Sequence, residues 1–245
     1  MRFIASLCFM AVMLTACSTT SYHKRRSFTP LEKAHYQNFS VIRTEMAIRG
    51  LELGSPLLIR AFKTEMELEV WTLNKYTGRY DLFKTYPICK KSGTLGPKQK
   101  EGDLQTPEGF YHTNAGLMNP NSKYHLSFNI GYPNEYDRAQ GRTGSALMIH
   151  GGCESEGCLA MNDKNIGEIY VMLDETFKRD VPHIPIHIYP FRMTDANMAL
   201  RANSPWMPFW QNIKEGYDYF ETYKIPPQIG VKDDAYIFGD PTSGA

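Results

Sequence analysis

Residues 150–161 read HGGCESEGCLAM, and this short stretch concentrates the reactive side chains of the chain. It holds one histidine, three glycines and two cysteines, although the 245-residue chain contains only 5 cysteines. An apolar run, ALMIH, leads into it, and a segment with apolar residues at helical spacing follows it. Three kinds of site use such residues: a cysteine nucleophile beside its base, a metal site, or a loop closed by a disulfide.

The first possibility is a nucleophile at Cys158 with His150 as its base. The thiolate is the attacking form, and a free thiol holds little of it at neutral pH. A histidine at the end of a strand can take the thiol proton, and the imidazolium then stabilises the thiolate. Gly157 precedes the cysteine, so backbone N–H groups can lie close to the thiol and form an oxyanion hole. The positive end of a helix predicted from residue 162 also favours a thiolate there.

The second possibility is a metal site built from His150, Cys153 and Cys158 in an H-x2-C-x4-C pattern. The remaining histidines are single and distant in the sequence, so we predict no bound metal. Ser155 offers another nucleophile, but no G-x-S-x-G turn surrounds it. A serine in such a loop more often bonds to nearby backbone.

The N-terminus has the features of an export signal. Residues 1–16 begin with a basic n-region and continue in an apolar run that is too short to span a bilayer. The run ends in Leu-Thr-Ala-Cys17, which resembles a bacterial lipobox and predicts cleavage before Cys17 with lipid attached to its thiol. Residues 17–29 then form a polar, basic tether. Because Ser18 follows the cysteine, we expect a periplasmic domain held by lipid at the inner leaflet of the outer membrane.

Three cysteines remain after the signal and the lipid site are set aside: Cys89, Cys153 and Cys158. The periplasm is oxidising, so free thiols there tend to pair. Because three is an odd number, at least one thiol is left over, and a leftover thiol invites a functional interpretation. A disulfide between Cys89 and either Cys153 or Cys158 remains open from the sequence.

The charge of the chain is balanced. It has 27 Lys and Arg residues against 26 Asp and Glu residues, and cleavage after residue 16 removes one basic residue and leaves 26 of each sign. A neutral balance gives no electrostatic attraction for nucleic acid, so we predict no such partner.

Alternation and turn residues predict a mainly β (α+β) fold with an antiparallel core, one inserted helix and a C-terminal helical appendage. An N-terminal region, residues 30–54, holds a helix that begins at Pro30 and ends at Gly50. A catalytic domain spans residues 55–192, and a helical and hairpin subdomain spans residues 193–245. The predicted strands are 56–62, 66–73, 80–89, 109–113, 126–130, 146–150 and 184–191. The predicted helices are 162–178, 195–203 and 205–223, and the hairpin is 228–231 with 235–238.

HGGCESEGCLAM resembles the signature of the YkuD-type L,D-transpeptidase catalytic domain family, a histidine and glycine followed by Ser-x-Gly-Cys and an apolar residue. TPEGFY at residues 106–111 resembles a second element of that domain, and residues 124–151 and the aromatic tail resemble its YafK-like subgroup. Together the resemblance covers about residues 55–235. Histidine and cysteine usually lie fifteen or more residues apart in the family and are eight apart here, a short form that the subgroup shares.

The resemblance implies the family's β-sandwich domain, with Cys158 as the nucleophile and His150 as the general base, oriented by the carbonyl of Gly151. It also implies that the backbone amides of Gly157 and Cys158 help to hold the oxyanion. The substrate would be a peptidoglycan stem peptide, attacked at the carbonyl of the L-centre of meso-diaminopimelate, and no cofactor is implied. An amine acceptor gives a crosslink or attaches a lipoprotein. Water gives a carboxypeptidase, or an amidase that frees wall-bound outer-membrane lipoprotein. The subgroup is associated with the hydrolytic amidase outcome, and this is the function we expect.

Four further side chains are candidates for contact with substrate. Arg142, in GRTG, is either a bidentate partner for a diaminopimelate carboxylate or a solvated loop arginine, and the sequence favours neither. Tyr132, His125 and Ser155 are the other candidates. Two alternative functions are a non-catalytic wall-binding lipoprotein, which the presence of both catalytic side chains disfavours, and a cysteine protease of other proteins.

Overall fold

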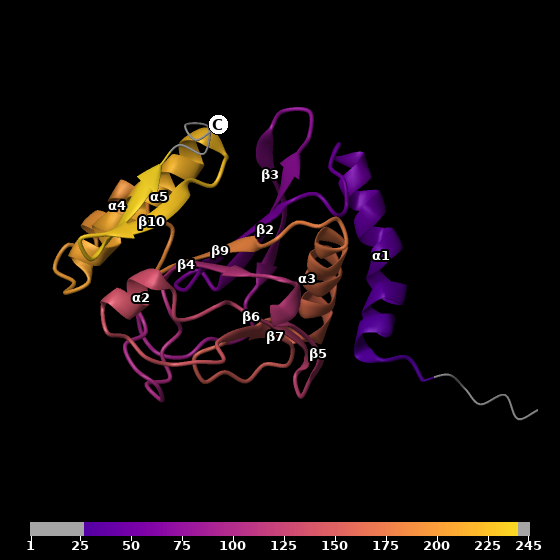
Figure 1. Ribbon diagram of the computed structural model, residues 1–245, viewed down its shortest axis with the longest axis horizontal. Helices are drawn as coiled ribbons and strands as arrows, with labels where there is room; N and C mark the ends of the chain where they lie inside the picture. Colours follow the sequence, from indigo (N-terminus) through magenta and orange to yellow (C-terminus); the bar gives the residue numbers. More distant parts are fainter. Residues whose placement is uncertain (1–26, 240–245) are drawn as a thin grey trace, which may run out of the picture.

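The computed structural model describes residues 27–239 of the chain (Figure 1). The predicted signal peptide, the lipid site Cys17 and most of the tether lie outside the described residues. Over residues 27–239, no helix combines the length and the apolar character needed to cross a membrane.

Two β-sheets contribute side chains to one main core. The first sheet has the strand order β3-β2-β1-β9-β4, and the second has the order β5-β6-β7-β8. Their bounds are β1 Leu57–Phe62, β2 Glu67–Asn74, β3 Arg79–Pro87, β4 Gly109–Thr113 and β9 Ile184–Tyr189, then β5 Met118–Ser122, β6 His125–Asn129, β7 Met148–His150 and β8 Leu159–Ala160. The predicted α+β class is confirmed. Most strand pairs of the core are antiparallel, as expected, whereas β1 with β9 and β7 with β8 are parallel pairs.

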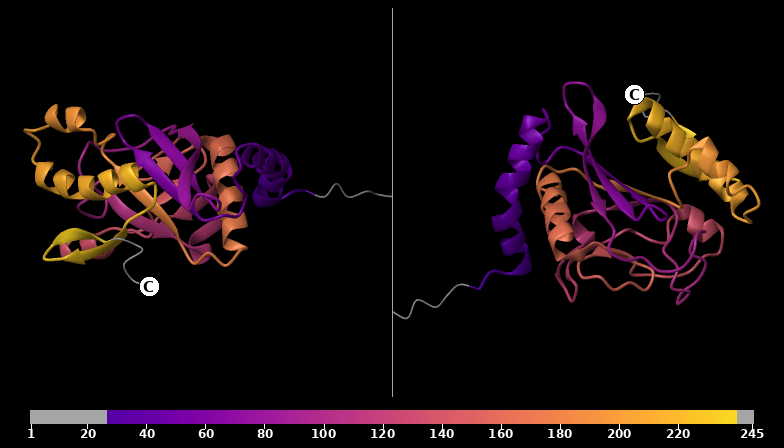
Figure 2. Two further views of the ribbon diagram at one scale, coloured as in Figure 1. Left: turned by 90° about the horizontal axis from the view of Figure 1, so that it is seen from above. Right: turned by 180° about the vertical axis from the view of Figure 1, so that it is seen from behind.

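Two helices close one side of this core. Helix α3 (Asn162–Phe177) packs its apolar face against the sheets, and α1 (Pro30–Ile48) lies alongside α3 (Figures 1 and 2). Thr29 caps the N-terminus of α1: its hydroxyl accepts from the Glu32 N–H, and the Glu32 carboxylate accepts from the Thr29 N–H. Both predicted helices are confirmed, and their ends lie within two residues of the predicted ends.

The five-stranded sheet is covered on both faces at its centre, and every residue of β1 is buried there, whereas much of β3 is exposed. Leu57, Ile59 and Ala61 face the main core, and Phe62 joins a second apolar cluster on the other side. Phe110, Tyr136 and Tyr189 also belong to that cluster, and the C-terminal elements supply many of its other members. These elements are α4 (Asp195–Ala199), α5 (Met207–Tyr223) and the hairpin of β10 (Gln228–Lys232) with β11 (Ala235–Gly239).

Four short elements were not predicted: β5, β8, helix α2 (Glu135–Ala139) and a 3-10 turn at Ala115–Leu117. Strand β8 has two residues, so it shows no alternation that a sequence pattern could reveal. Tertiary pairing with β7 creates it.

Candidate active site

Strands β7 and β8 bring the predicted nucleophile and base together. They run parallel in register, with Ile149 opposite Leu159 and His150 opposite Ala160. Cys158 immediately precedes β8, and the N–H of Met148 donates to its Sγ at 3.4 Å. Side chains alternate along a strand, so residues 158 and 160 share the sheet face used by residues 148 and 150. The thiol and the imidazole therefore project from the same face of two neighbouring strands.

His150 is held in one tautomer by the backbone. Its Nδ1 lies 2.6 Å from the carbonyl oxygen of Gly151, which can only accept a hydrogen bond, so Nδ1 carries the proton. The neutral ring then has its lone pair on Nε2, as a general base requires. Burial lowers the pKa of His150 below 6.5, which keeps the ring unprotonated at neutral pH.

Tyr124 covers the His150 ring, and the sequence did not single it out. The two rings stack with centroids 4.8 Å apart and planes 28° from parallel. Tyr124 precedes β6, the strand that pairs with β7, so its position follows from strand pairing. No motif in the sequence marked this contact in advance.

The Cys158 thiol is half-buried, and burial raises its pKa above the ordinary value of 9.0. The Met148 N–H and the Lys98 ammonium act in the opposite direction but do not cancel the effect of burial. The thiol is therefore protonated at neutral pH and needs a base to become a nucleophile.

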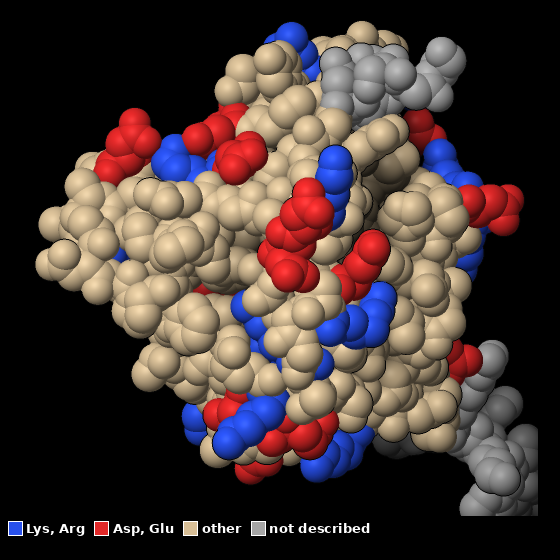
Figure 3. All heavy atoms as spheres, turned by 60° about the vertical axis from the view of Figure 1, so that its left-hand side comes forward, with Lys and Arg blue, Asp and Glu red and all other residues tan. Residues whose placement is uncertain are grey.

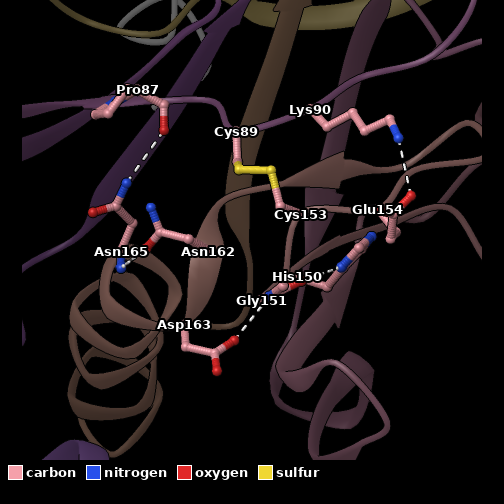
Figure 4. Close-up of a disulfide and its surroundings, with 11 residues drawn as sticks. Pro87, Cys89, Lys90, His150, Gly151, Cys153, Glu154, Asn162, Asp163 and Asn165 are labelled. Carbon is pink, nitrogen blue, oxygen red and sulfur yellow. Dashed lines mark hydrogen bonds and ion pairs between the residues drawn. A yellow bond between two sulfur atoms is a disulfide. The ribbon is translucent and has the colours of Figure 1, made fainter.

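The loop between base and nucleophile is anchored at several points (Figure 4). Cys153 forms a disulfide with Cys89, with Cα atoms 5.4 Å apart, and Cys158 is the free thiol. This resolves the pairing that the sequence left open. The Gly152 N–H donates to the Asp163 carboxylate at 2.8 Å. At Gly151 a Cβ would lie 2.6 Å from the Tyr124 carbonyl oxygen, so only glycine fits there.

The disulfide also contradicts the hypothesis of a metal site in this loop. The sulfur of Cys153 is bonded to Cys89, so it is not available as a thiolate ligand. Among the described residues, His35, Asp174 and Glu175 are the group whose ligand atoms lie close enough for a metal. Lys178 already pairs with both carboxylates, at 2.8 and 2.7 Å. This group is an ion network between α1 and α3.

Two predicted roles around Cys158 do not fit the hydrogen bonds. The Gly157 N–H already donates to the Ser92 hydroxyl at 2.5 Å, so in this conformation it is not offered to an oxyanion. The Cys158 N–H remains the predicted donor. The Ser155 hydroxyl donates to the Cys158 carbonyl at 2.7 Å, which is the backbone-bonding role. While that bond is present, the Ser155 hydroxyl can contact a substrate only as a hydrogen-bond acceptor.

Arg142 is neither a solvated loop residue nor a side chain presented to substrate. It is only 7 % exposed, its Nη1 pairs with Asp137 at 2.9 Å, and its guanidinium lies over the rings of Tyr136 and Phe209. This placement does not fit the predicted carboxylate contact. The sequence could not show it, because the aromatic partners come from α2 and α5.

Tyr132 and His125 are the remaining two candidates for contact with substrate. Tyr132 is buried, and its hydroxyl donates to the carbonyls of Lys98 and Thr143, each at 3.4 Å. The Tyr132 side chain is therefore packed inside the protein and is not presented to a substrate. His125 is half-buried at the start of β6, where its Cβ lies beside Gly151.

In the loop at residues 90–107, which flanks the nucleophile, Lys98 is buried. The Lys98 ammonium bonds to the Lys100 carbonyl and to Asp103. A second buried lysine, Lys63, bonds to the carbonyls of Gly96 and Thr106. These lysines hold the loop against the core next to Cys158.

A buried ion pair connects this loop to the C-terminal helix. The Lys63 ammonium lies 2.9 Å from a Glu108 oxygen, and the second Glu108 oxygen accepts from Trp210 Nε1 at 2.9 Å. Neither side chain of the ion pair is exposed. Helix α5 thus supports the loop that flanks the nucleophile.

Comparisons with known proteins identify the family of the chain. Residues 59–188 match the family model described as the L,D-transpeptidase catalytic domain, YkuD. The chain is 40 % identical over 245 residues, 99 % of this chain and 93 % of the relative, to the Escherichia coli (strain K12) protein named "Putative L,D-transpeptidase YafK". Among solved structures, the helical cell shape determining protein Pgp2 from Campylobacter jejuni aligns over 78 % of this chain and 80 % of its own, with 20 % identity and a TM-score of 0.45. L,D-transpeptidase 1 from Mycobacterium tuberculosis aligns over 54 % and 61 %, with 16 % identity and a TM-score of 0.30. The chain belongs to the YkuD family of L,D-transpeptidase catalytic domains, cysteine enzymes that modify peptidoglycan and act on its stem peptides.

Proposed function

We propose that the protein is a periplasmic, lipid-anchored hydrolase of the cell wall that uses Cys158 to cleave an amide at the L-centre of meso-diaminopimelate. The amine released is the side-chain end of a wall-bound lipoprotein or a terminal residue of the stem peptide. The observation that carries the proposal is the arrangement of Cys158 and His150 on one face of β7 and β8, with Nδ1 of His150 fixed by the Gly151 carbonyl.

The chemistry follows from the protonation states of the two side chains. His150 Nε2 accepts the thiol proton, and the thiolate attacks the carbonyl carbon to form a tetrahedral oxyanion near the Cys158 N–H. The C–N bond then breaks, the leaving amine takes the proton from the imidazolium, and a thioester remains. Water attacks the thioester with His150 again as base. This second attack restores the thiol and releases a free carboxylate.

Transpeptidation is the second candidate, and the name of the Escherichia coli relative favours it. The first half of the reaction is unchanged, and an amine replaces water as the acceptor. Both outcomes use the same thioester, so the products distinguish them and the two catalytic side chains do not.

The test uses the full chain in detergent, incubated with sacculi that carry bound lipoprotein, beside a Cys158→Ala control. We expect the active protein alone to release lipoprotein that ends in an unmodified lysine, detected by mass spectrometry. New crosslinks between diaminopimelates would support the transpeptidase instead. No change in any muropeptide, under reducing and oxidising conditions alike, would reject both and favour a wall-binding protein.

Membrane attachment through Cys17 is part of the proposal and has its own test. Labelling of growing cells with a clickable fatty acid is expected to mark the native chain, and a Cys17→Ala variant is expected to lose the label. A labelled Cys17→Ala variant would remove the anchor from the proposal.

A further inference from the structure

A cavity of about 800 Å³ lies between the five-stranded sheet and the C-terminal hairpin, and none of the catalytic side chains lines it. Its volume is within the range of ligand-binding sites. Residues from β4, α2, β9 and β10 form its walls. The mechanism above makes no use of it.

The lining residues show which parts of the strands face the cavity. From β9 and the residue before it, only alternate positions contribute, namely His183, Pro185 and His187, so β9 presents one sheet face as a floor. From β10, consecutive residues contribute, from Gln228 through Val231. Successive side chains of a strand point to opposite faces, so a consecutive run means that the cavity lies along the edge of β10.

This edge is the unpaired side of the hairpin. Strand β10 pairs only with β11 among the described strands. Tyr236 of β11 uses its own N–H and C=O to bond to Asn212 of α5, so these groups point away from β10. Tyr236 is opposite Val231 in the register, and residues opposite one another in an antiparallel ladder share this orientation. The N–H and C=O of Val231 therefore point away from β11, toward the cavity, and those of Ile229 do the same two residues earlier.

We propose that this groove binds an extended polypeptide segment as an added strand on β10, and that the segment belongs to the protein joined to the stem peptide. The proposal rests on the proposed function, since only a hydrolase of wall-bound protein meets such a chain at its leaving group. Two donors and two acceptors at strand spacing match the main chain of an extended peptide. Ile229, Val231 and the prolines at 133, 185 and 226 supply half-buried apolar surface for its side chains.

The groove and the nucleophile lie on two sides of one segment. Gly131 and Pro133 line the groove, whereas the Tyr132 hydroxyl between them bonds to the carbonyl of Lys98. Lys98 is the residue whose ammonium acts on the Cys158 thiol. A chain leaving the scissile bond would pass this segment to reach β10. Binding there acts on the leaving group far from the reacting atoms, so it lowers KM and leaves the bond-breaking step unchanged.

The experiment compares two substrates with the full chain in detergent. The first is a muropeptide whose diaminopimelate carries lysine alone, and the second carries a lipoprotein C-terminal peptide of about ten residues, roughly 33 Å when extended. We expect KM to be about tenfold lower for the second substrate, a difference of about 1.4 kcal/mol. In Val231→Pro, which removes the outward N–H, this advantage disappears while the first substrate is cleaved at the unchanged rate. Val231→Thr keeps the N–H and is the matched control, expected to retain the advantage.

A second arm changes the peptide and leaves the protein intact. N-methylation of alternate peptide residues is expected to abolish the advantage in one parity and to preserve it in the other, because only one set of N–H groups faces β10. An equal KM for both substrates would overturn the proposal that the groove binds the peptide. The same holds if neither set of N-methylated peptides loses the advantage. A dimer of the free protein that Val231→Pro dissociates, seen by light scattering, would mean that a second copy occupies the edge and would also overturn it.

The experiments distinguish a failure of the peptide-binding proposal from a failure of the proposed function. If the protein cleaves neither substrate, the proposed release of wall-bound lipoprotein fails. Fluorescence anisotropy of the labelled ten-residue peptide with the full chain then tests the groove by itself: binding that Val231→Pro weakens about tenfold supports it, and equal binding to both proteins rejects it.

Discussion

At the scale of single residues, the catalytic pair depends on opposing effects of burial. Burial raises the pKa of the Cys158 thiol and lowers the pKa of the His150 imidazole, so both groups are neutral before the reaction. The base is then ready to accept a proton and the thiol is ready to give one. Burial is the largest cause of both pKa shifts, so it is burial that keeps the two side chains neutral.

The first prediction concerns the pH dependence of this pair. As the pH falls through the lowered pKa of His150, the imidazole takes a proton and can no longer accept one from the thiol. We therefore expect the acid limb of kcat/KM to lie below pH 6.5, measured with the lysine-bearing muropeptide. Tyr124→Leu removes the stacked ring that buries the imidazole, and we expect it to move this limb to higher pH. An acid limb above 6.5 in the native protein would contradict the assignment.

The second prediction concerns Gly151, whose carbonyl orients the base. In Gly151→Ala the new Cβ would lie 2.6 Å from the Tyr124 carbonyl and 2.7 Å from the Asp163 carboxylate, so one of them must move. We expect a loss of about 1–3 kcal/mol in the free energy of unfolding, the range found for overpacked sites, and a fall in kcat of at least tenfold. Gly116→Ala is the control, because its nearest neighbour is a side-chain oxygen at 3.3 Å. Native kcat in Gly151→Ala would show that the tight loop is unnecessary.

At the scale of elements, the disulfide anchors the loop that carries both catalytic residues. It joins Cys89, just beyond β3, to Cys153, and its ends are 64 residues apart in sequence. A loop of that length corresponds to a stabilisation of about 4 kcal/mol in the chain-entropy description. We predict that Cys89→Ser with Cys153→Ser lowers the free energy of unfolding by about 2–4 kcal/mol in urea and lowers kcat. Thiol titration of the unfolded native protein showing both cysteines free would contradict the pairing.

Sequence patterns predicted the elements whose own residues carry the signal. The cap and spacing of α1, the helical periodicity of α3 and the alternation of β9 are local properties, and each of these elements is present. The two-residue β8 and the parallel pairing of β1 with β9 arise only when distant segments meet. The site residues also divide into those marked by a local motif and those placed by distant segments. His150 and Cys158 lie within one motif, whereas the burial of Arg142 depends on rings from two helices.

At the scale of the whole molecule, the five-stranded sheet holds charged and titratable groups in its second apolar layer. Arg60 is fully buried, and its guanidinium lies 4.7 Å from the ring centroid of Phe220 and 4.9 Å from that of Tyr217, both on α5. His187 is buried beside it in β9. On the side of the molecule shown in Figure 3, acidic and basic side chains are interspersed, which agrees with the balanced composition.

Burial lowers the pKa of His187 to about 3, with a further contribution from Arg60, and this predicts an acid-sensitive fold. Between pH 6.5 and about 3 the unfolded chain binds a proton that the folded chain does not bind. The free energy of unfolding therefore falls as the pH falls through this range, by up to about 1.4 kcal/mol per unit from this residue. We expect urea unfolding at pH 7, 5.5 and 4.5 to show the decrease, and His187→Gln to reduce its slope. An unchanged slope in the variant would remove His187 as the cause.

The most direct test of the central claim is intact-protein mass spectrometry of the full chain during turnover of the lysine-bearing muropeptide in water enriched in oxygen-18. The account predicts an acyl adduct that maps to Cys158, accumulates transiently, and yields a product carboxylate with one heavy oxygen. His150→Ala should form the adduct far more slowly, and Cys158→Ala should form none. Product formation by Cys158→Ala at the native rate, or an adduct on any other residue, would contradict it.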